Sequence, residues 1–467
     1  MEGHRAHVVV VGAGISGLAA AWFLRQGAGE RLRVTVLEGS PRIGGKLYAS
    51  EVAGIRVDAG AEAMLARRPE GKELAKAVGL GDDLVQPGTT RSAVYSRGTL
   101  RPLPKGQVMG VPSDLTELAK SGIVSPGGLL RVPLDQILPP TLVRTDVSVA
   151  AYIRARMGGE VVDRLVEPLL GGVYAGRADM LSLEATMPRV AAVARSERSL
   201  LSAARLLVEE APKDAGPVFT TLRNGLGGLP EAVAKASGAD VRTGVTVREL
   251  RRTETGWRLV TGPVPRPEVV EADAVIVAVP GPAASRLLKD EAPKAADELA
   301  RIQYASMAVV TLAYPVDAFP EPPASSGYLV PPVERRPVKA VTFSSVKWPH
   351  LSNDLVILRC SIGRVGEEHL LQRDDTELVS LATAEMADVM GVSGLPADTR
   401  VTRWGGGLPQ YNVGHLDRVA RVRAAVSGQP GLAVCGAAYD GLGIPACVGT
   451  ARTAAARILD HLTLRGE

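Results

Sequence analysis

Three glycines at fixed spacing follow a short apolar run near the N-terminus. The run VVVV at 8–11 predicts a buried parallel strand, and a helix is expected at 15–27. The hexapeptide Gly12, Ala13, Gly14, Ile15, Ser16 and Gly17 follows the strand and includes the first residues of the helix. The first glycine permits a tight turn, the second lets the backbone approach a pyrophosphate, and the third lets helix and strand pack closely. Free N–H groups at the helix N-terminus then favour phosphate.

A carboxylate stands where such a turn needs one. Glu38 lies 21 residues beyond Gly17, at the end of the next predicted strand, 33–38. A carboxylate at this position accepts hydrogen bonds from ribose hydroxyls and repels a 2′-phosphate. The pattern therefore predicts a site for FAD or NAD rather than NADP, whereas the glycines alone could form an ordinary turn.

Two further segments favour a flavin nucleotide. After Glu38 come Gly39, Ser40, Arg42, Gly44, Gly45 and Lys46, whose glycines suit a backbone wrapped around a pyrophosphate and whose cations can contact phosphate. The alternative for the two cations is solvated surface charge. We expect the bare backbone near the flavin at Gly60, Ala61, Glu62 and Ala63.

A strand expected at 431–435 and a terminal helix expected at 445–464 enclose a second glycine-rich turn. Pro445 suits the first helical turn, and this helix tip can face the flavin edge that becomes negative on reduction. The alternative is a structural turn. The remaining expected cofactor contacts are Val245, Trp404, Gly436, Tyr439 and Ile444.

The pattern ExxxRxGGK after GAGISG resembles the flavin amine oxidase superfamily. Within it, four segments resemble the protoporphyrinogen and coproporphyrinogen oxidases, in order along nearly the whole chain: EPLLGGVYAGRADMLS (167–182), RNGLGGLPEAV (223–233), RWGGGLPQYNVGHLDR (403–418) and AYDGLGIPACVGTAR (438–452). The resemblance implies non-covalent FAD and oxidation of a porphyrinogen by oxygen in haem biosynthesis, with release of hydrogen peroxide. It favours coproporphyrinogen III over protoporphyrinogen IX. An oxidase of amines or carotenoids and a non-catalytic FAD- or tetrapyrrole-binding protein remain as alternatives.

Three positions depart from the family pattern. Gly60-Ala61 stands where the family often has Gly-Pro, and Tyr439-Asp440 stands where amine oxidases often carry the cysteine that links FAD covalently. The family arginine that meets a propionate has Arg91 as its nearest candidate here, while Ser92 occupies the family position itself. Recognition of the propionates is therefore left open.

The substrate carboxylates need cations, and the expected pocket is wide and mostly apolar. Candidate substrate contacts are Arg67, Arg91, Arg177 and Lys347, with backbone contacts from Gly172 and Val173; surface charge is the alternative for each cation. We expect no catalytic side chain and no metal, because the flavin carries the chemistry. The six histidines are scattered and are interpreted as structural or surface residues.

The expected fold class is α/β with three parts. A discontinuous Rossmann-like FAD-binding domain takes 1–84, 222–285 and 428–467, an antiparallel-sheet substrate domain takes 85–105, 165–221 and 286–427, and 106–164 forms a small helical lid or membrane-facing domain. The formal charge of +4 over 467 residues does not favour nucleic acid, and three dispersed cysteines suit a reducing compartment. We expect a cytoplasmic protein, and leave open weak contact with the inner face of a membrane, transfer of product to a ferrochelatase, and the oligomeric state.

Overall fold

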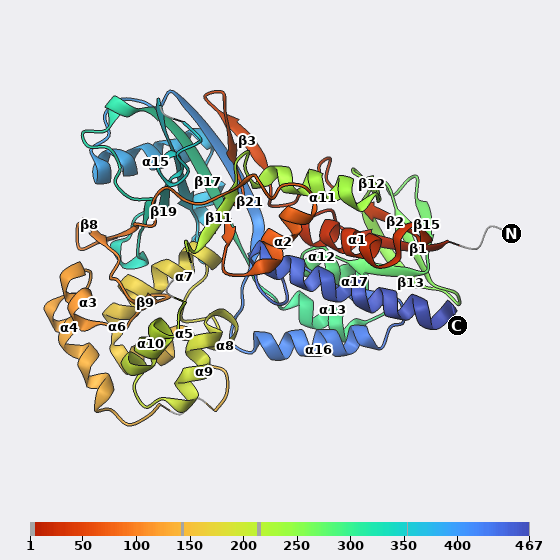
Figure 1. The fold of residues 1–467 in the computed structure, drawn as a ribbon, viewed down its shortest axis with the longest axis horizontal. Helices are drawn as coiled ribbons and strands as arrows, with labels where there is room; N and C mark the ends of the chain where they lie inside the picture. The colour runs from red at the N-terminus through yellow and green to blue at the C-terminus, as the bar shows by residue number, and fades with distance from the viewer. Residues whose placement is uncertain (1–4, 142–143, 213–215, 353, 467) are drawn as a thin grey trace.

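A computed structural model describes residues 5–141, 144–212, 216–352 and 354–466, so the ends of the predicted domain ranges at 1–4 and 467 lie outside it. A five-stranded parallel sheet lies at one end of the molecule (Figure 1), in the order β12-β2-β1-β16-β22. Its N-terminal strands are β1 (Ala6–Val11) and β2 (Leu32–Leu37). The other three come from later parts of the chain: β12 (Asp240–Arg242), β16 (Ala274–Val277) and β22 (Leu432–Val434).

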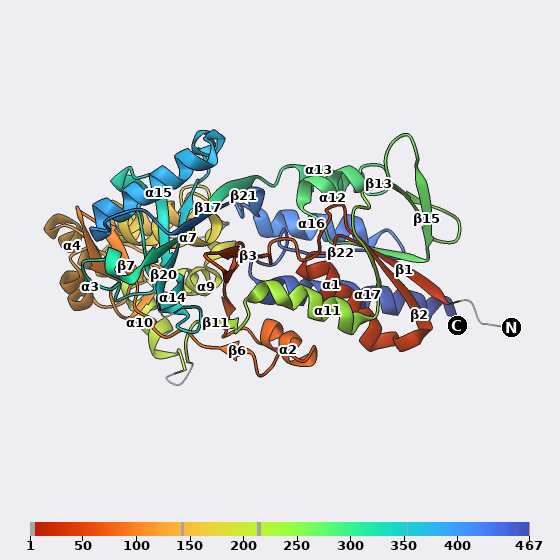
Figure 2. The same ribbon diagram turned by 90° about the horizontal axis from the view of Figure 1, so that it is seen from above.

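Helices cover both faces of this sheet (Figure 2). Val8 and Val10 pack in one core with α1 (Ile15–Ala28), α11 (Leu229–Ser237) and α17 (Ile444–Gly466). Val9 and Val11 pack on the other face with α12 (Gly281–Leu288), α13 (Pro293–Ala300), α16 (His415–Ser427) and a three-stranded sheet of β13 (Val247–Arg252), β14 (Trp257–Thr261) and β15 (Glu268–Ala272). Because both faces are buried, β1 is apolar at successive positions rather than alternating.

A seven-stranded sheet forms the second part, in the order β21-β17-β20-β19-β18-β7-β8. Its strands are β7 (Ala93–Ser96), β8 (Thr99–Pro102), β17 (Tyr304–Pro315), β18 (Gly327–Leu329), β19 (Val338–Phe343), β20 (Leu355–Ile362) and β21 (Asp398–Pro409). Its pairs are antiparallel except β18 with β7, which run parallel. Helix α15 (Asp375–Met390) shares one core with β17, β18, β19 and β20, and Ala313 and Ile357 of the sheet pack in a separate cluster with Val52 and Val57.

Short helices form the third part, at the lower left of Figure 1. They are α3 (Leu115–Ser121), α4 (Pro126–Arg131), α5 (Val149–Met157), α6 (Gly159–Val161), α7 (Glu167–Tyr174), α8 (Leu183–Thr186), α9 (Pro188–Ser196) and α10 (Leu200–Glu209). Side chains from both sides of residue 165 share one core. The predicted domain boundaries stay a prediction, and the one at 164/165 passes through this packed unit.

The glycine-rich composition of 40–64 predicts an irregular segment, and the sequence at 162–176 predicts a helix running into a glycine turn; both differ in part from the structure. The segment 40–64, expected to be irregular, contains a hairpin of β3 (Ala49–Val52) and β4 (Ile55–Asp58). The helix expected within 162–176 is present and ends in a turn, but Gly171 and Gly172 lie inside α7 and the chain turns at Ala175, whose φ is 50°. A helix tolerates glycine at a cost of about 1 kcal/mol each, so packing can override the local preference.

Smaller elements join the parts. They are β5 (Met64–Leu65), α2 (Pro69–Ala77), β6 (Leu84–Val85), β9 (Gln107–Val108), β10 (Val111–Pro112), β11 (Phe219–Leu222) and α14 (Ser344–Lys347). Strand β11 pairs with both β5 and β6 between the two large sheets. Among the described helices, none combines the length and the apolar character needed to cross a bilayer.

Candidate active site

The turn from β1 into α1 requires glycine at two positions. Gly12 has φ +103°, its N–H donates to Leu37 O at 2.7 Å, and a Cβ there would lie 2.7 Å from Ala278 O. A Cβ on Gly17 would overlap Gly12 O. The tight turn and the close helix–strand approach expected from the sequence are therefore both present in the structure.

Two glycine loops meet at the start of α1. Gly14 and Gly44 form a parallel bridge, and Gly44 N–H donates to Ala13 O at 2.8 Å. A Cβ on Gly45 would lie 3.4 Å from Gly14 Cα, whereas a Cβ on Gly14 would meet no atom within 4 Å. Among the described residues, no side chain caps the N-terminus of α1. Open space beside uncapped N–H groups fits a bound phosphate.

Glu38 lies beside this turn, at the end of β2. Its carboxylate accepts hydrogen bonds from Ala13 N at 2.7 Å and Ser40 N at 2.8 Å. Its backbone carbonyl accepts from Val245 N at 2.8 Å, and a Cβ on Gly39 would lie 3.1 Å from the Thr246 hydroxyl. The predicted ribose-binding carboxylate, Ser40 and Val245 are thus neighbours.

The two cations of the second loop have different surroundings. The Arg42 guanidinium lies 4.2 Å from the Tyr48 ring centroid and 5.9 Å from that of Trp404. Lys46 has no hydrogen-bond or ion-pair partner within the described part of the chain, and burial lowers the pKa of its ammonium. An uncompensated, partly buried cation beside the glycine loops fits a phosphate ligand.

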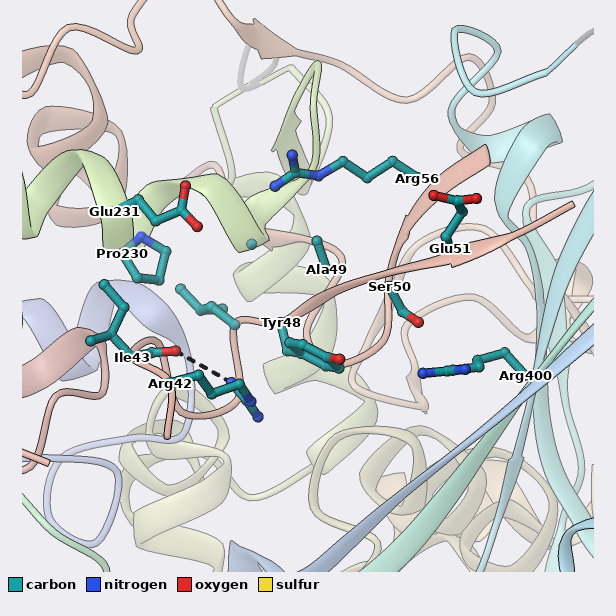
Figure 3. A pocket seen from close by; sticks show the side chains of 12 residues that line it. Arg42, Ile43, Tyr48, Ala49, Ser50, Glu51, Arg56, Pro230, Glu231 and Arg400 are labelled. Atoms are coloured by element: carbon teal, nitrogen blue, oxygen red, sulfur yellow. Dashed lines mark hydrogen bonds between the residues drawn. The ribbon is translucent and has the colours of Figure 1, made fainter. Parts of the chain in front are cut away.

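A hollow of about 520 Å³ adjoins Arg42 (Figure 3). Arg42, Arg56 of β4 and Arg400 of β21 surround it, together with Glu51 and Glu231. The remaining lining residues are Ile43, Leu47, Tyr48, Ala49, Ser50, Gly227 and Pro230. The hollow lies between the nucleotide-binding part and edge strand β21 of the seven-stranded sheet.

The closing segment returns to the first turn. A Cβ on Gly436, whose φ is +130°, would lie 3.9 Å from Ser16 Oγ, and Gly436 N donates to Thr450 Oγ1 at 3.1 Å. Tyr439 is buried, and its hydroxyl has no partner among the described residues. Ile444 and Pro445 begin α17, whose N-terminal end therefore lies beside that of α1.

Two side chains after β21 hold the closing segment. The Tyr411 hydroxyl donates to Ala437 O at 2.5 Å, and His415 Nε2 lies 3.2 Å from Tyr439 O. The rings of Tyr411 and His415 stack with centroids 3.9 Å apart. The closing glycine segment is thus held by two side chains that follow β21.

The loop at 59–63 is anchored to the seven-stranded sheet. Trp404 Nε1 donates to Ala59 O at 3.0 Å, and Arg359 Nη2 donates to Gly60 O at 2.6 Å. A Cβ on Gly60 would overlap Lys46 O, to which Ala61 N–H donates at 3.2 Å. Ala63, at the end of this loop, leads into β5.

Glu62 is the centre of a buried ion cluster. Its carboxylate is 2.8 Å from Lys347 Nζ and 2.9 Å from Arg359 Nη1, and it accepts from Ser344 Oγ at 3.1 Å. Burial alone would raise the pKa of Glu62, but the two cations outweigh it and lower the pKa to about 2. Burial raises the pKa of neighbouring Asp58 to about 6, against the N–H groups it accepts from. Lys347 thus already has an anionic partner.

The other predicted substrate contacts are more dispersed. Gly172 and Val173 are exposed on α7, and a Cβ on Gly172 would lie 3.3 Å from Leu329 Cδ2. Arg177 lies 3.6 Å from the Glu167 carboxylate. Arg67 and Arg91 are exposed, and the Arg91 carbonyl accepts from Ser326 at 2.8 Å. These contacts do not yet define a single carboxylate-binding site.

Sequence reasoning missed Arg359, which is 8% exposed and joins the seven-stranded sheet to the loop at 59–63. A signal for it exists in β20, where it is the one charged residue in LVILRCSI. A charge inside an otherwise apolar strand indicates a buried partner, but the sequence does not say which one.

Relatives of known class agree with this geometry. The sequence profile described as flavin containing amine oxidoreductase matches residues 15–459. The coproporphyrinogen III oxidase of Mycobacterium tuberculosis is 40% identical over 460 residues, 97% of each chain. That of Bacillus subtilis is 33% identical over 476 residues, 99% of this chain and 100% of the relative. A crystal structure of an Exiguobacterium sp. 255-15 protein has a TM-score of 0.87 and 31% identity, covering 99% of both chains.

The chain therefore belongs to the flavin-containing amine oxidoreductase family. Within that family it groups with the protoporphyrinogen and coproporphyrinogen oxidases, so the resemblance stated from the motifs is confirmed. Family membership implies a flavin cofactor. The open space at Gly14, the Glu38 carboxylate and the Lys46 ammonium, which no described residue pairs with, fit a flavin nucleotide.

Proposed function

We propose that this protein oxidises coproporphyrinogen III to coproporphyrin III with molecular oxygen, releasing hydrogen peroxide, as a step of haem biosynthesis. The observation that carries the proposal is 40% identity along 97% of the chain to an enzyme named for that substrate. The conversion removes six electrons in three two-electron steps and consumes three molecules of oxygen. Flavin chemistry, when the cofactor is bound, couples each two-electron oxidation to reduction of oxygen.

The cofactor in this proposal is FAD, held without a covalent bond. Glu38 supports the choice, because an adenosine ribose offers the hydroxyls that its carboxylate can accept from. Tyr439 and Asp440 stand where covalent relatives often have cysteine. Cys435 and Cys447 are buried, and burial raises the pKa of both thiols, which keeps them unreactive. Acid precipitation should release all flavin into the supernatant.

The chain's own residues bind, orient and exclude water in this proposal. The α1 N-terminus and Lys46 would hold phosphate, and Glu38 would hold ribose. Gly60, Trp404 and the N-terminal end of α17 would hold the flavin ring. The remaining proposed contacts are those named from the sequence: Gly12, Ala13, Gly14, Ile15, Ser16, Gly17, Gly39, Ser40, Arg42, Gly44, Gly45, Ala61, Glu62, Ala63, Val245, Gly436, Tyr439, Ile444 and Pro445 for cofactor, and Arg67, Arg91, Gly172, Val173, Arg177 and Lys347 for substrate.

Anaerobic mixing with each porphyrinogen tests the proposal. Coproporphyrinogen III should bleach the oxidised-flavin absorbance, and admitting oxygen should restore it with three hydrogen peroxide molecules formed per porphyrin. Bleaching by an amine but by neither porphyrinogen would assign the chain to an amine-oxidising function. Bleaching by none of them would indicate a binding protein.

Protoporphyrinogen IX is the second candidate substrate. It is supported by a tobacco protein named chloroplastic protoporphyrinogen oxidase, which is 28% identical over 484 residues. A comparison of kcat/KM for the two porphyrinogens under identical conditions decides between them. We expect the higher value for coproporphyrinogen III.

The proposal places the enzyme in the cytoplasm, with the helical part as the surface for weak membrane contact. Leu130 and Ile137 there are 75% and 70% exposed, and Leu134 lies between them in the sequence. Flotation with anionic vesicles tests this contact, and replacement of Leu130 and Ile137 by serine should abolish it. Transfer of the product to a ferrochelatase stays a prediction from the sequence.

A further inference from the structure

A lysine without a partner is buried in the substrate sheet. Lys339 of β19 is 3% exposed, and its Nζ has no hydrogen-bond partner among the described residues. Burial lowers the pKa of its ammonium to about 7, with nearby Arg364 adding to the effect and Glu367 opposing it. None of the sequence motifs pointed to this residue.

Lys339 lies where the sheet meets α7. Its backbone carbonyl accepts from Val330 N at 2.9 Å, in the stretch that extends β18. Leu329, the preceding residue, lies against Gly172 of α7. Beyond the end of β20, Val365 N donates to Ala175 O at 2.9 Å, directly after α7. Lys339 is therefore close to the helix that carries Gly172 and Val173, the proposed backbone contacts of the substrate.

The charges around Lys339 do not balance. Arg364, 3% exposed, donates to Val330 O at 2.8 Å and to both Glu367 oxygens at 3.0 and 3.2 Å. Glu367 is thus already paired, and two buried cations share one carboxylate. An uncompensated buried charge is costly unless a ligand of opposite sign completes the site.

We propose that Lys339, with Arg364 beside it, forms a subsite for a carboxylate arm of the substrate at the C-terminal end of α7. The inference rests on the proposed function, because coproporphyrinogen III carries four such arms whereas protoporphyrinogen IX carries two. A carboxylate here forms a charge-assisted hydrogen bond with the free Nζ. Lys347 and Arg177 each already lie beside an acidic side chain. Lys339 would therefore supply a cation for the substrate carboxylate that has no such partner among the described residues.

Binding of coproporphyrin III to the holoenzyme tests the subsite without turnover. The titration follows porphyrin fluorescence for wild type, Lys339→Met and Lys339→Arg, with exposed Lys289→Met as the matched control. We expect Lys339→Met to weaken binding about ten- to a hundredfold, the range of a charge-assisted hydrogen bond. Lys339→Arg and Lys289→Met should stay within about threefold of wild type.

The tetramethyl ester of coproporphyrin III separates charge from shape. If the subsite reads a carboxylate, Lys339→Met should leave ester binding unchanged. Equal losses for acid and ester would overturn the proposal, because they would mean that the substitution only distorts the pocket. Unchanged binding of the acid would overturn it as well. Flavin content and thermal unfolding are measured on each variant first.

The wild type provides a second test that needs no folded variant. The charged groups that act on Lys339 are Arg364 and Glu367. Affinity for coproporphyrin III should therefore fall as pH rises through the Lys339 pKa of about 7. A flat profile would contradict the subsite. If wild type binds coproporphyrin III in this pattern but oxidises neither porphyrinogen, the proposed function fails and the subsite stands.

Discussion

Replacing Glu62 by glutamine probes the buried ion cluster that joins the two large sheets. The wild-type carboxylate compensates Lys347 and Arg359 at 2.8 and 2.9 Å, and all three side chains are mostly buried. Glutamine keeps the size and one acceptor oxygen but removes the charge. Two cations are then left in a site with a low dielectric constant, with Asp58 as a nearby acid.

The expected loss follows from the pKa of Glu62. A fall from its ordinary value of 4.5 to about 2 corresponds to about 3 kcal/mol of stabilisation at neutral pH. Removing one partner of a buried pair costs about 3–5 kcal/mol in other proteins, so the two figures agree. Because the folded-state pKa is the lower one, this contribution is complete above about pH 4.5 and is lost as pH falls towards 2.

Urea unfolding of the FAD-saturated protein, followed by circular dichroism, measures the loss. Glu62→Gln should lower the free energy of unfolding by about 3 kcal/mol at neutral pH, and the gap to wild type should narrow under acid conditions. Exposed Glu254→Gln serves as the control and should change it by less than about 0.5 kcal/mol. A Glu62→Gln effect as small as the control would refute the reasoning, as would a gap that widens in acid.

Three further substitutions test separate parts of the structure. Gly14→Val should lower FAD content at least about tenfold, because the added side chain would fill the space that we assign to the phosphate. The circular dichroism spectrum should not change, because the added side chain meets no protein atom. If the variant retains FAD, the phosphate does not lie beside Gly14. Asp135→Asn should destabilise by about 3–5 kcal/mol in a thermal melt, since Arg156 at 2.5 Å would stay buried and charged. Tyr411→Phe should lower the free energy of unfolding by about 1–3 kcal/mol, because Ala437 O loses its donor. It should also slow flavin reduction by porphyrinogen while KM is retained. An unaltered rate would show that the closing segment keeps its position without this hydrogen bond.

The turn around Gly12 shows what sequence can predict. Its three glycines and Glu38 interact within about thirty residues, so their spacing alone constrains the geometry. The family resemblance then extended the prediction to the closing turn at Gly436, which is more than 400 residues away. Without it, nothing in the local pattern relates that turn to Ser16.

The sequence could not predict which residues from distant segments pair with each other. Glu62 was expected to contact cofactor and Lys347 substrate, yet the structure pairs them with each other across 285 positions. Lys339 is similar, because an isolated lysine in a strand reads as an exposed residue until the fold buries it. Burial is a property of the assembled layers, and the alternation of one strand reports it poorly when both faces are covered.

The order of strands in the parallel sheet bears on how the protein is made. β1 and β2 leave the ribosome early, but β16, which pairs with β1, follows 266 positions later (Val8 pairs with Ala274), and the edge strand β22 comes almost at the end. Contacts so distant along the chain form slowly, and the apolar faces of β1 and α1 stay uncovered during synthesis. Loss of even the last forty residues would remove β22 and α17 together, so a truncated chain should aggregate rather than persist as a nucleotide-binding fragment.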